Sequence, residues 1–154
     1  MTEEEVVCKF ADMVYRIAMI RMKHPCEVDD VFQDVFLKYL KSGRNIQDEE
    51  HLKAWLIRVT INCCNSAQTN LWKKRTVPMG GQEEAVWEFP DNDDGIIKAV
   101  SELPEKERDV IHLFYYEEYS IREISRILNS TEGAVKTRLS RARDRLRKKL
   151  EKSC

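Results

Sequence analysis

The amino-acid sequence predicts an all-α protein made of two small helical domains. Apolar residues recur at three- and four-residue spacing toward both ends of the chain, as they do along amphipathic helices. Between these ends, residues 76–94 hold two of the four prolines, two of the five glycines and several acidic residues, but no basic residue. That composition is typical of a linker. We therefore expect helical domains at residues 1–75 and 95–154, joined by an acidic flexible linker at 76–94.

The N-terminal part predicts two amphipathic helices, separated by Pro25. The apolar face comprises Phe10, Met13, Val14, Ile17 and Ile20 in the first helix, and Val28, Val31, Phe32, Val35, Phe36, Tyr39 and Leu40 in the second. The polar side of the second helix is left for solvent or for a partner, and it comprises Asp29, Asp30, Gln33, Asp34, Lys38 and Lys41. From the residues alone, a solvated surface is the simpler interpretation.

A third helix is predicted with a polar stripe opposite its apolar face. The apolar face comprises Leu52, Trp55, Leu56, Val59 and Cys63, and the stripe comprises Arg58, Asn62, Asn65, Thr69 and Trp72. Because the stripe runs into Lys73, Lys74 and Arg75, it combines amides, an aromatic ring and cations, which suit single-stranded nucleic acid. An ordinary helix exterior with a partly buried tryptophan fits these residues equally well.

Residues 120–150 predict two helices around a tight turn, the pattern of a helix-turn-helix. Ser120 and Glu123 fit a capping box, so a helix should begin at Ser120. Asn129 tolerates the left-handed conformation that ends a helix, and Thr131 can cap the next one. The apolar side is Ile121, Ile124, Ile127 and Leu128 in the first helix, with Arg122, Ser125 and Arg126 largely outside it, and Val135, Leu139, Ala142, Leu146 and Leu150 in the second.

Charge is segregated along the chain in a way that favours DNA binding by the second helix of this motif. The formal net charge is -1, but residues 131–154 hold nine basic and three acidic residues, whereas residues 76–118 hold three and twelve. The first turns of such a helix enter the major groove, where Glu132, Gly133, Lys136, Thr137, Ser140 and Arg141 are the exposed candidates. Residues further along suit phosphate better, namely Arg143, Arg145, Arg147, Lys148 and Lys149. The alternatives are an amphipathic helix with a solvated basic face, or a bundle helix.

Other function classes lack their signatures. The acidic start of the chain is no secretory signal, and no apolar run reaches membrane-spanning length. The five cysteines form an odd set without a CxxC spacing, which argues against disulfides and zinc, and favours a reducing cytoplasm. There is no glycine-rich phosphate loop and no nucleophile in a recognisable setting. We expect no enzyme activity, no cofactor, no metal site and no membrane insertion; for Cys63 and Cys64 a buried pair is favoured over a redox sensor.

The order of these pieces carries a family resemblance. DDVFQDVFLKYLK, then HLKAWLIRVTINCCNSAQ, then a linker, then ELPEKERDVIHLFYYEEYSIREISRILNSTEGAVKTRLSRARDRL together closely resemble the extracytoplasmic-function class of sigma factors of the sigma-70 family. The resemblance covers nearly the whole chain. It implies a sigma region 2-like domain at residues 1–75 and a sigma region 4-like domain at 95–154, with promoter-directed transcription initiation as the function.

The resemblance also assigns partners to particular residues. Bacterial core RNA polymerase would bind the second helix at Asp30, Gln33, Asp34 and Lys38. The downstream promoter element, with its melted non-template strand, would be met by Arg58, Asn62, Trp72, Lys73 and Lys74. The upstream element would be read as duplex by Thr131, Glu132, Gly133, Lys136, Thr137, Ser140, Arg141 and Arg143. A separate anti-sigma protein is the expected regulator.

Three positions depart from the family pattern without removing a DNA-reading group. Glu118 stands where glycine is frequent, Ser125 where alanine is common, and Asn129 where a turn glycine is frequent. Glu118 would cost roughly 1 kcal/mol if its backbone must be left-handed. An alternative class is a sigma-like regulator or adaptor that binds DNA without directing initiation. A conventional regulator of this kind should need a dimer to read two half-sites.

Overall fold

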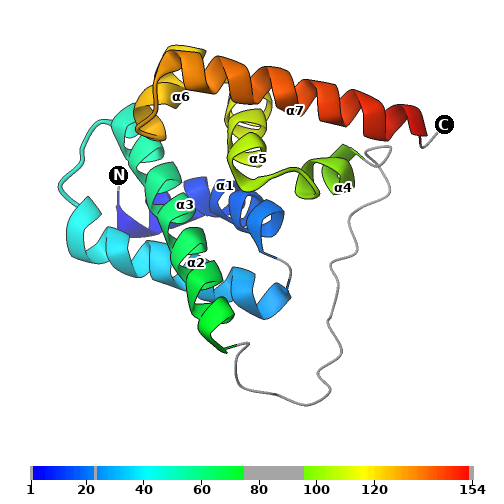
Figure 1. The fold of residues 1–154 in the computed structure, drawn as a ribbon. Coiled ribbons are helices and arrows are strands. Elements are labelled where there is room, and N and C mark those ends of the chain that lie inside the picture. The colour runs from blue at the N-terminus through cyan, green and yellow to red at the C-terminus, as the bar shows by residue number, and fades with distance from the viewer. Residues whose placement is uncertain (1, 23, 75–95, 153–154) are drawn as a thin grey trace. The chain divides into compact units, whose positions relative to one another are not determined.

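The computed structural model describes residues 2–22, 24–74 and 96–152, with the side chains at 70–74, 96–97 and 152 left out (Figure 1). The regular secondary structure in this part of the chain is entirely helical, without strands, which confirms the predicted all-α fold class. The chain divides into two compact units, unit 1 at Met1–Trp87 and unit 2 at Glu88–Cys154. The predicted linker at 76–94 lies outside the described residues, and so does Arg75.

Unit 1 is a three-helix unit. It consists of α1 (Glu3–Arg21), α2 (Pro25–Lys38), which continues into the π-helical turn η1 (Tyr39–Gly43), and α3 (Glu49–Lys74). The Thr2 hydroxyl caps α1 by accepting from the Glu5 amide at 3.2 Å, and Pro25 opens α2, where a missing N–H costs nothing. α1 and α2 run in opposite directions, and α3 crosses both (Figure 1), so the three apolar faces share one core.

The apolar faces predicted for α1 and α2 are mostly buried, but the prediction was wrong at the end of α2. Leu40 is 41% exposed, although Tyr39 just before it is buried. The cause is η1, because its wider i→i+5 turn breaks the 3.6-residue period on which the prediction was based. Ile20 and Phe32 are half-buried, and the Phe32 ring is stacked on Tyr15 with centroids 4.5 Å apart.

α3 is buried over a wider arc than the sequence predicted. Leu52, Leu56 and Cys63 lie in the core as expected, while Trp55 and Val59 are half-buried. Because α3 packs against both α1 and α2, further residues are buried as well, namely Ile57, Thr60, Ile61 and Cys64. The Thr60 hydroxyl can be buried because it donates to the Leu56 carbonyl at 2.6 Å.

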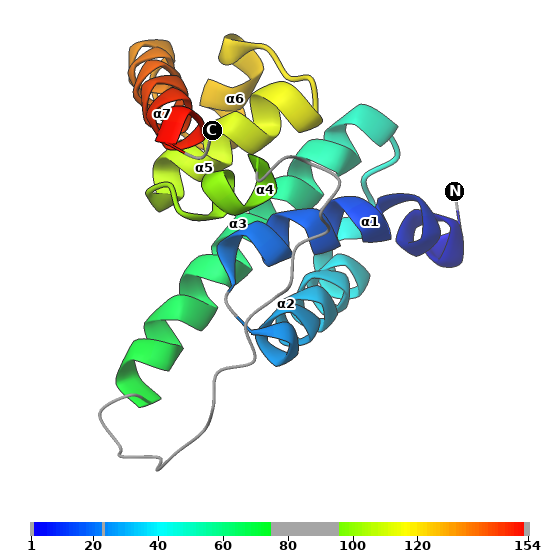
Figure 2. The ribbon, with the colours of Figure 1, turned by 90° about the vertical axis from the view of Figure 1, so that its right-hand side faces the viewer.

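Unit 2 is built around its last helix. It consists of α4 (Ile96–Ser101), α5 (Glu105–Ile111), the π-helical turn η3 (His112–Tyr116), α6 (Ile121–Ile127) and α7 (Glu132–Lys152). α7 packs against α4, α5 and α6, as both views of this unit show (Figures 1 and 2). The predicted seam of α7 is buried at Val135, Leu139 and Ala142, and it is half-buried at Leu146 and Leu150.

The caps predicted for the helix-turn-helix are confirmed. Both bonds of the capping box between Ser120 and Glu123 are present at 3.1 Å, and the Thr131 hydroxyl accepts from the Ala134 amide at 3.0 Å. Asn129 adopts the left-handed conformation, with φ of 53°. Ser125 corrects the prediction, since it is buried rather than outside the apolar face. Its hydroxyl donates to the Arg122 carbonyl at 2.6 Å, so burial leaves it satisfied.

Glu118, in the turn that leads into α6, has the left-handed backbone for which the sequence analysis gave an energetic cost. Glu118 has φ of 59°, a conformation that costs a side-chain-bearing residue about 1 to 2 kcal/mol. The preceding residue, Glu117, is buried, and its carboxylate lies 3.3 Å from Nε2 of the equally buried His112. The turn is therefore held from within by a His–Glu contact while its next residue is strained.

Candidate nucleic-acid interface

The exposed side of α7 presents the predicted base-reading residues together. Glu132, Lys136, Ser140 and Arg141 are all exposed on this helix. Within the described part of the chain, the side chains of Lys136 and Arg141 make no ion pair or hydrogen bond. Two cationic side chains near the start of a capped helix are therefore available to bases and phosphates.

Gly133 leaves open space at the start of α7. A Cβ built on it would meet no atom within 4 Å, so packing within the described residues does not require glycine there. One turn later the Thr137 hydroxyl donates to the Gly133 carbonyl at 3.0 Å. Because Gly133 carries no side chain and is exposed, a DNA backbone has room to approach the start of α7 closely.

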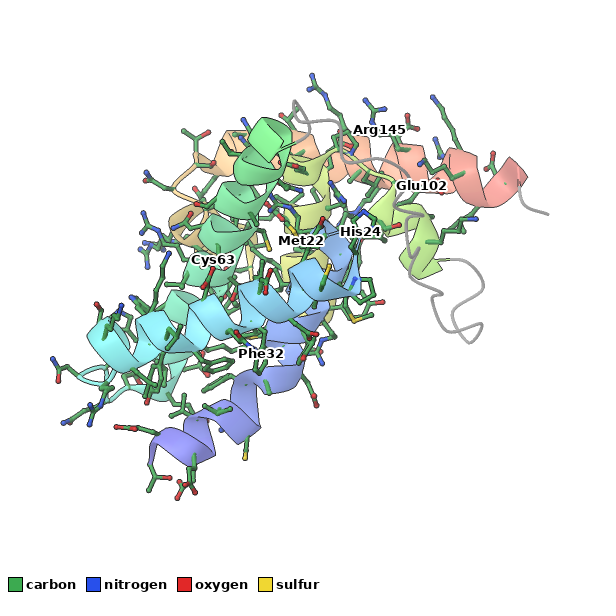
Figure 3. The ribbon with its side chains drawn as sticks, turned by 90° about the horizontal axis from the view of Figure 1, so that it is seen from below. Met22, His24, Phe32, Cys63, Glu102 and Arg145 are labelled. Carbon is green, nitrogen blue, oxygen red and sulfur yellow. The ribbon has the colours of Figure 1, made fainter. Side chains whose placement is uncertain are left out.

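The second half of α7 is less available than its basic composition suggested. Four of the five cations predicted to suit phosphate are paired with carboxylates: Arg145 with Glu107 at 3.1 Å, Arg147 and Lys148 with Asp144 at 2.9 and 3.3 Å, and Lys149 with Glu102 at 3.0 Å. Figure 3 labels Glu102, just after α4, and Arg145 on α7. Lys148, and then Arg147, hold the pKa of the Asp144 carboxyl below its usual value. That these residues suit phosphate better than bases stays a prediction, and each of the four must leave its carboxylate to make such a contact.

Arg143 differs from these four cations in its partners. Its Nε donates to the Tyr115 hydroxyl at 2.6 Å, and its Cζ lies 5.4 Å from the ring centroid of Phe114 and 5.5 Å from that of Tyr115. All of these partners are uncharged. Arg143 therefore keeps its positive charge uncompensated while its position is restrained.

α6 adds two cations that the predicted site did not include. Arg122 and Arg126 are exposed, and their guanidinium groups have no partner among the described residues. In a helix-turn-helix the first helix crosses the DNA backbone. The sequence placed both residues off the apolar face of this helix, so that signal could have added them as phosphate contacts.

The polar stripe of α3 is only partly free. Arg58 and Asn62 are exposed, and their side chains have no partner within the described residues. Asn65, by contrast, accepts a hydrogen bond from the buried Arg21 of α1, which also donates to Gln68 at 3.3 Å. The backbone of α3 extends to Lys74, but the side chains of the predicted Trp72, Lys73 and Lys74 lie outside the described residues.

The outer side of α2 brings the predicted polymerase-binding residues onto one exposed surface. Asp30, Gln33, Asp34 and Lys38 follow at spacings of three, one and four residues and are all exposed. Leu37 lies among them and is 53% exposed, an apolar residue that the sequence reading did not include. Burial raises the pKa of the Cys63 thiol on α3, while the Lys38 ammonium lowers it and the Asp34 carboxylate adds to the rise. The Cys63 position is labelled in Figure 3.

Membrane-spanning helices and clustered metal ligands are both absent from the described part of the chain. No helix there is both long and apolar enough to cross a membrane. No group of three or more histidine, cysteine, aspartate or glutamate side chains is placed there to hold a metal ion.

A helix-turn-helix with free cations on its second helix, preceded by a separate three-helix unit, defines a DNA-binding protein of transcription. Comparison with known families sharpens this class. The model "Sigma-70 region 2" matches residues 7–74, and "Sigma-70, region 4" matches residues 94–146. The chain belongs to the sigma-70 family of RNA polymerase sigma factors.

Curated relatives agree with both matches. The chain is 26% identical to the ECF RNA polymerase sigma factor SigW of Bacillus subtilis, with 95% of this chain and 87% of the relative covered. It is 27% identical to the ECF RNA polymerase sigma factor SigM of the same organism, covering 96% and 94%. The RNA polymerase sigma-E factor of Streptomyces avermitilis is 28% identical, covering 96% and 84%.

Solved structures show the same fold. The sigma factor RpoE, in complex with the anti-sigma factor NepR from Bartonella quintana, matches with a TM-score of 0.80 at 24% identity, covering 97% of this chain and 96% of the other. CnrH, in complex with the cytosolic domain of CnrY, matches with a TM-score of 0.70 at 20% identity, covering 99% and 89%.

Proposed function

We propose that this protein binds the core of bacterial RNA polymerase through α2 and directs it to promoters that its two units contact at separate elements. The observation that carries the proposal is the pair of family regions in order along one chain. The second region contains a capped helix-turn-helix, on which Lys136 and Arg141 are exposed. The domains are the region 2-like part at 1–75 and the region 4-like part at 95–154. The protein acts by binding, without catalysis or a cofactor, in the cytoplasm.

The polymerase contact is assigned to the exposed surface formed by Asp30, Gln33, Asp34 and Lys38. Leu37 joins this surface, because an apolar side chain that is 53% exposed among charged neighbours gains from burial against a partner. Charged residues around an apolar centre are the usual anatomy of a protein interface.

The two DNA contacts differ in kind. In unit 2, α7 reads the upstream element as duplex with Lys136, Thr137, Ser140 and Arg141 on its exposed side. The remaining upstream candidates are Thr131, Glu132, Gly133 and Arg143. In unit 1, Arg58 and Asn62 of α3 face the downstream element, where the strands separate, together with Trp72, Lys73 and Lys74.

Regulation by a separate anti-sigma protein is part of the proposal. The two solved structures described above each hold a partner, the anti-sigma factor NepR with RpoE and the cytosolic domain of CnrY with CnrH. An anti-sigma protein that covers the α2 surface would compete directly with core polymerase.

The decisive experiment is multi-round transcription by purified bacterial core polymerase on a genomic promoter library, with and without this protein, read out by sequencing. Transcripts that appear only with the protein and share two spaced upstream motifs support the proposal and supply the promoter. If no transcripts depend on the protein while unit 2 still binds duplex DNA, the chain is instead a sigma-like regulator or adaptor.

Oligomeric state separates the same two classes. A sigma factor works as one chain within the holoenzyme, whereas a conventional regulator reads two half-sites as a dimer. Size-exclusion chromatography with light scattering should therefore give a monomer. A stable dimer that binds palindromic duplex without polymerase would count against the sigma-factor assignment.

A further inference from the structure

Tyr115 is an exposed aromatic residue on η3 that contacts α7 through Arg143. Its side chain is 53% exposed, yet its hydroxyl accepts the Nε proton of Arg143 at 2.6 Å. The neighbouring Phe114 ring meets Tyr115 edge-on, with centroids 5.0 Å apart and an interplanar angle of 77°. The Arg143 guanidinium carbon lies 5.4 and 5.5 Å from the two centroids, within cation–π range. One hydrogen bond and two ring contacts therefore restrain one guanidinium group.

The restraint leaves the charge of Arg143 available. Arg145, Arg147, Lys148 and Lys149 are each paired with a carboxylate, whereas the partners of Arg143 are a phenol and two rings. An anion that approaches Arg143 meets a full positive charge with no competing carboxylate. Within the described residues, the terminal nitrogens of its fork make no hydrogen bond, and a guanidinium fork matches a phosphate through such N–H groups.

The place of Arg143 on α7 suits a DNA phosphate. Lys136, Ser140 and Arg143 follow at spacings of four and three residues, so they lie along one line of the helix. Lys136 and Ser140 are on the exposed surface assigned to the upstream element, and Arg143 is also exposed. Arg143 therefore extends that line by one turn, where a helix that enters the groove comes near the sugar-phosphate backbone.

We propose that Tyr115 is a positioning residue of the upstream-element interface, which holds the Arg143 guanidinium ready for a backbone phosphate of the promoter duplex. The proposal rests on the function proposed above. An arginine side chain normally loses rotamer freedom when it binds an anion. Here the loss is already met in the free protein, so the contact with phosphate is stronger than that of an unrestrained arginine.

A purely structural role, in which the pair only ties η3 to α7, has different consequences. It would lower the stability of unit 2 when the hydroxyl is lost, but it would leave the number of phosphates contacted unchanged. A positioning role changes DNA affinity through Arg143 alone. The two effects are separated by a double-mutant cycle.

The experiment measures promoter binding by the holoenzyme as a function of salt. Core polymerase is combined with wild-type protein, Tyr115→Phe, Arg143→Gln or the double variant, on a promoter duplex obtained from the transcription library. Phenylalanine keeps the ring and removes only the hydroxyl. Arg147→Gln is the matched control, because it removes a cation already paired with Asp144. Phosphate contacts made by the polymerase itself are common to all variants and cancel. Thermal unfolding of each variant is recorded alongside.

Arg143→Gln should weaken binding and flatten the plot of log K against log salt by about 0.9, the loss of one phosphate contact. In the protein that keeps Arg143, Tyr115→Phe should weaken binding about two- to tenfold, as expected for the loss of one hydrogen bond. It should change nothing in the Arg143→Gln background, and Arg147→Gln should leave the slope unchanged.

Two results overturn this inference while the proposed function stands. One is that the wild-type holoenzyme binds its promoter, but the slope of log K against log salt is the same for Arg143→Gln as for wild type. The other is an equal loss from Tyr115→Phe in both backgrounds, which means that the hydroxyl acts through the fold or on its own. A wild-type protein that fails to direct core polymerase to any promoter instead overturns the proposed function, and this inference with it.

Discussion

Among single residues, Lys136 and Arg141 should contribute most to promoter recognition. Both are exposed on α7, and neither has a hydrogen-bonding or ionic partner within the described part of the chain. A cation without an internal partner breaks no ion pair when it binds DNA, whereas a paired cation must first leave its carboxylate. Exposed ion pairs are weak, so this exchange is a matter of degree.

Replacing Lys136 or Arg141 by alanine should weaken binding to the upstream element by about 1 to 3 kcal/mol each if they contact bases. If they contact phosphate, the salt dependence should fall instead, and the loss should be similar on all DNA sequences. Fluorescence anisotropy with matched and mismatched duplexes distinguishes the two. Arg147→Ala is the control, because Arg147 is paired with Asp144. Wild-type affinity in both variants would mean that another face of α7 meets the DNA.

Asp144→Asn should increase the affinity for duplex DNA. The carboxylate of Asp144 holds Arg147 at 2.9 Å and Lys148 at 3.3 Å, and its removal frees two cations. The slope of log K against log salt should steepen by up to about 1.8, as for two additional phosphate contacts. Asp12→Asn on α1 is the matched control, since it removes the same charge from unit 1. An unchanged slope for Asp144→Asn would show that these cations lie beyond the DNA.

At the scale of elements, two short segments depart from regular α-helix and shape the surfaces on either side. η1 turns Leu40 outward at the end of α2, and η3 carries Tyr115 toward α7. A wider helical turn shifts every later side chain around the axis. The exposed faces that follow these turns are therefore set by the backbone rather than by the apolar period.

Glu118→Gly should stabilise unit 2, because the turn before α6 holds a left-handed residue with φ of 59°. Relief of the strain contributes about 1 to 2 kcal/mol, and the greater freedom of glycine in the unfolded chain offsets about 0.5 to 1 kcal/mol. The free energy of unfolding should rise by the difference, as measured by chemical denaturation.

Glu118→Ala is the matched control for this change. It removes the same carboxylate but keeps a Cβ in the left-handed conformation, so it should show no gain. A gain of equal size in both variants would trace the effect to the lost charge rather than to the backbone.

At the scale of the whole molecule, the chain has two units, each with its own core, and its proposed tasks are divided between them. In the proposed function, unit 1 carries the polymerase surface and the downstream contact, and unit 2 carries the upstream contact. Two modest sites on one chain bind cooperatively because each raises the effective concentration of the other. The division predicts that a change in one unit leaves the isolated task of the other intact.

Asp34→Arg should abolish or strongly weaken association with core polymerase while duplex binding by unit 2 is unchanged. The substitution reverses a charge at the centre of the exposed α2 surface, beside Leu37. Co-elution with core polymerase measures the first task and anisotropy the second. Asp12→Arg, an equal charge reversal on α1, should affect neither. Normal polymerase binding by a folded Asp34→Arg protein would refute the assignment of this surface.

The sequence by itself determined the local features of this protein. The Ser120–Glu123 capping box, the left-handed Asn129 and the Thr131 cap are set by residues within a few positions of one another, and all three are confirmed. The helical periods are set in the same way, and they failed where tertiary packing or a π-helical turn intervened, as at Ser125 and Leu40. The order of the two family regions also lies in the sequence, and it was sufficient to identify the class.

Only the tertiary structure decided which of the predicted side chains are free. Asn65 is bound by Arg21, and Arg145 and Lys149 are paired with Glu107 and Glu102, in each case across dozens of residues. A periodic pattern shows which side of a helix faces outward. It does not show which carboxylate from a distant part of the chain lies next to that side. Arg143 is likewise held by a residue of a different element, Tyr115 of η3. Because this partner is uncharged, the positive charge of Arg143 is not neutralised.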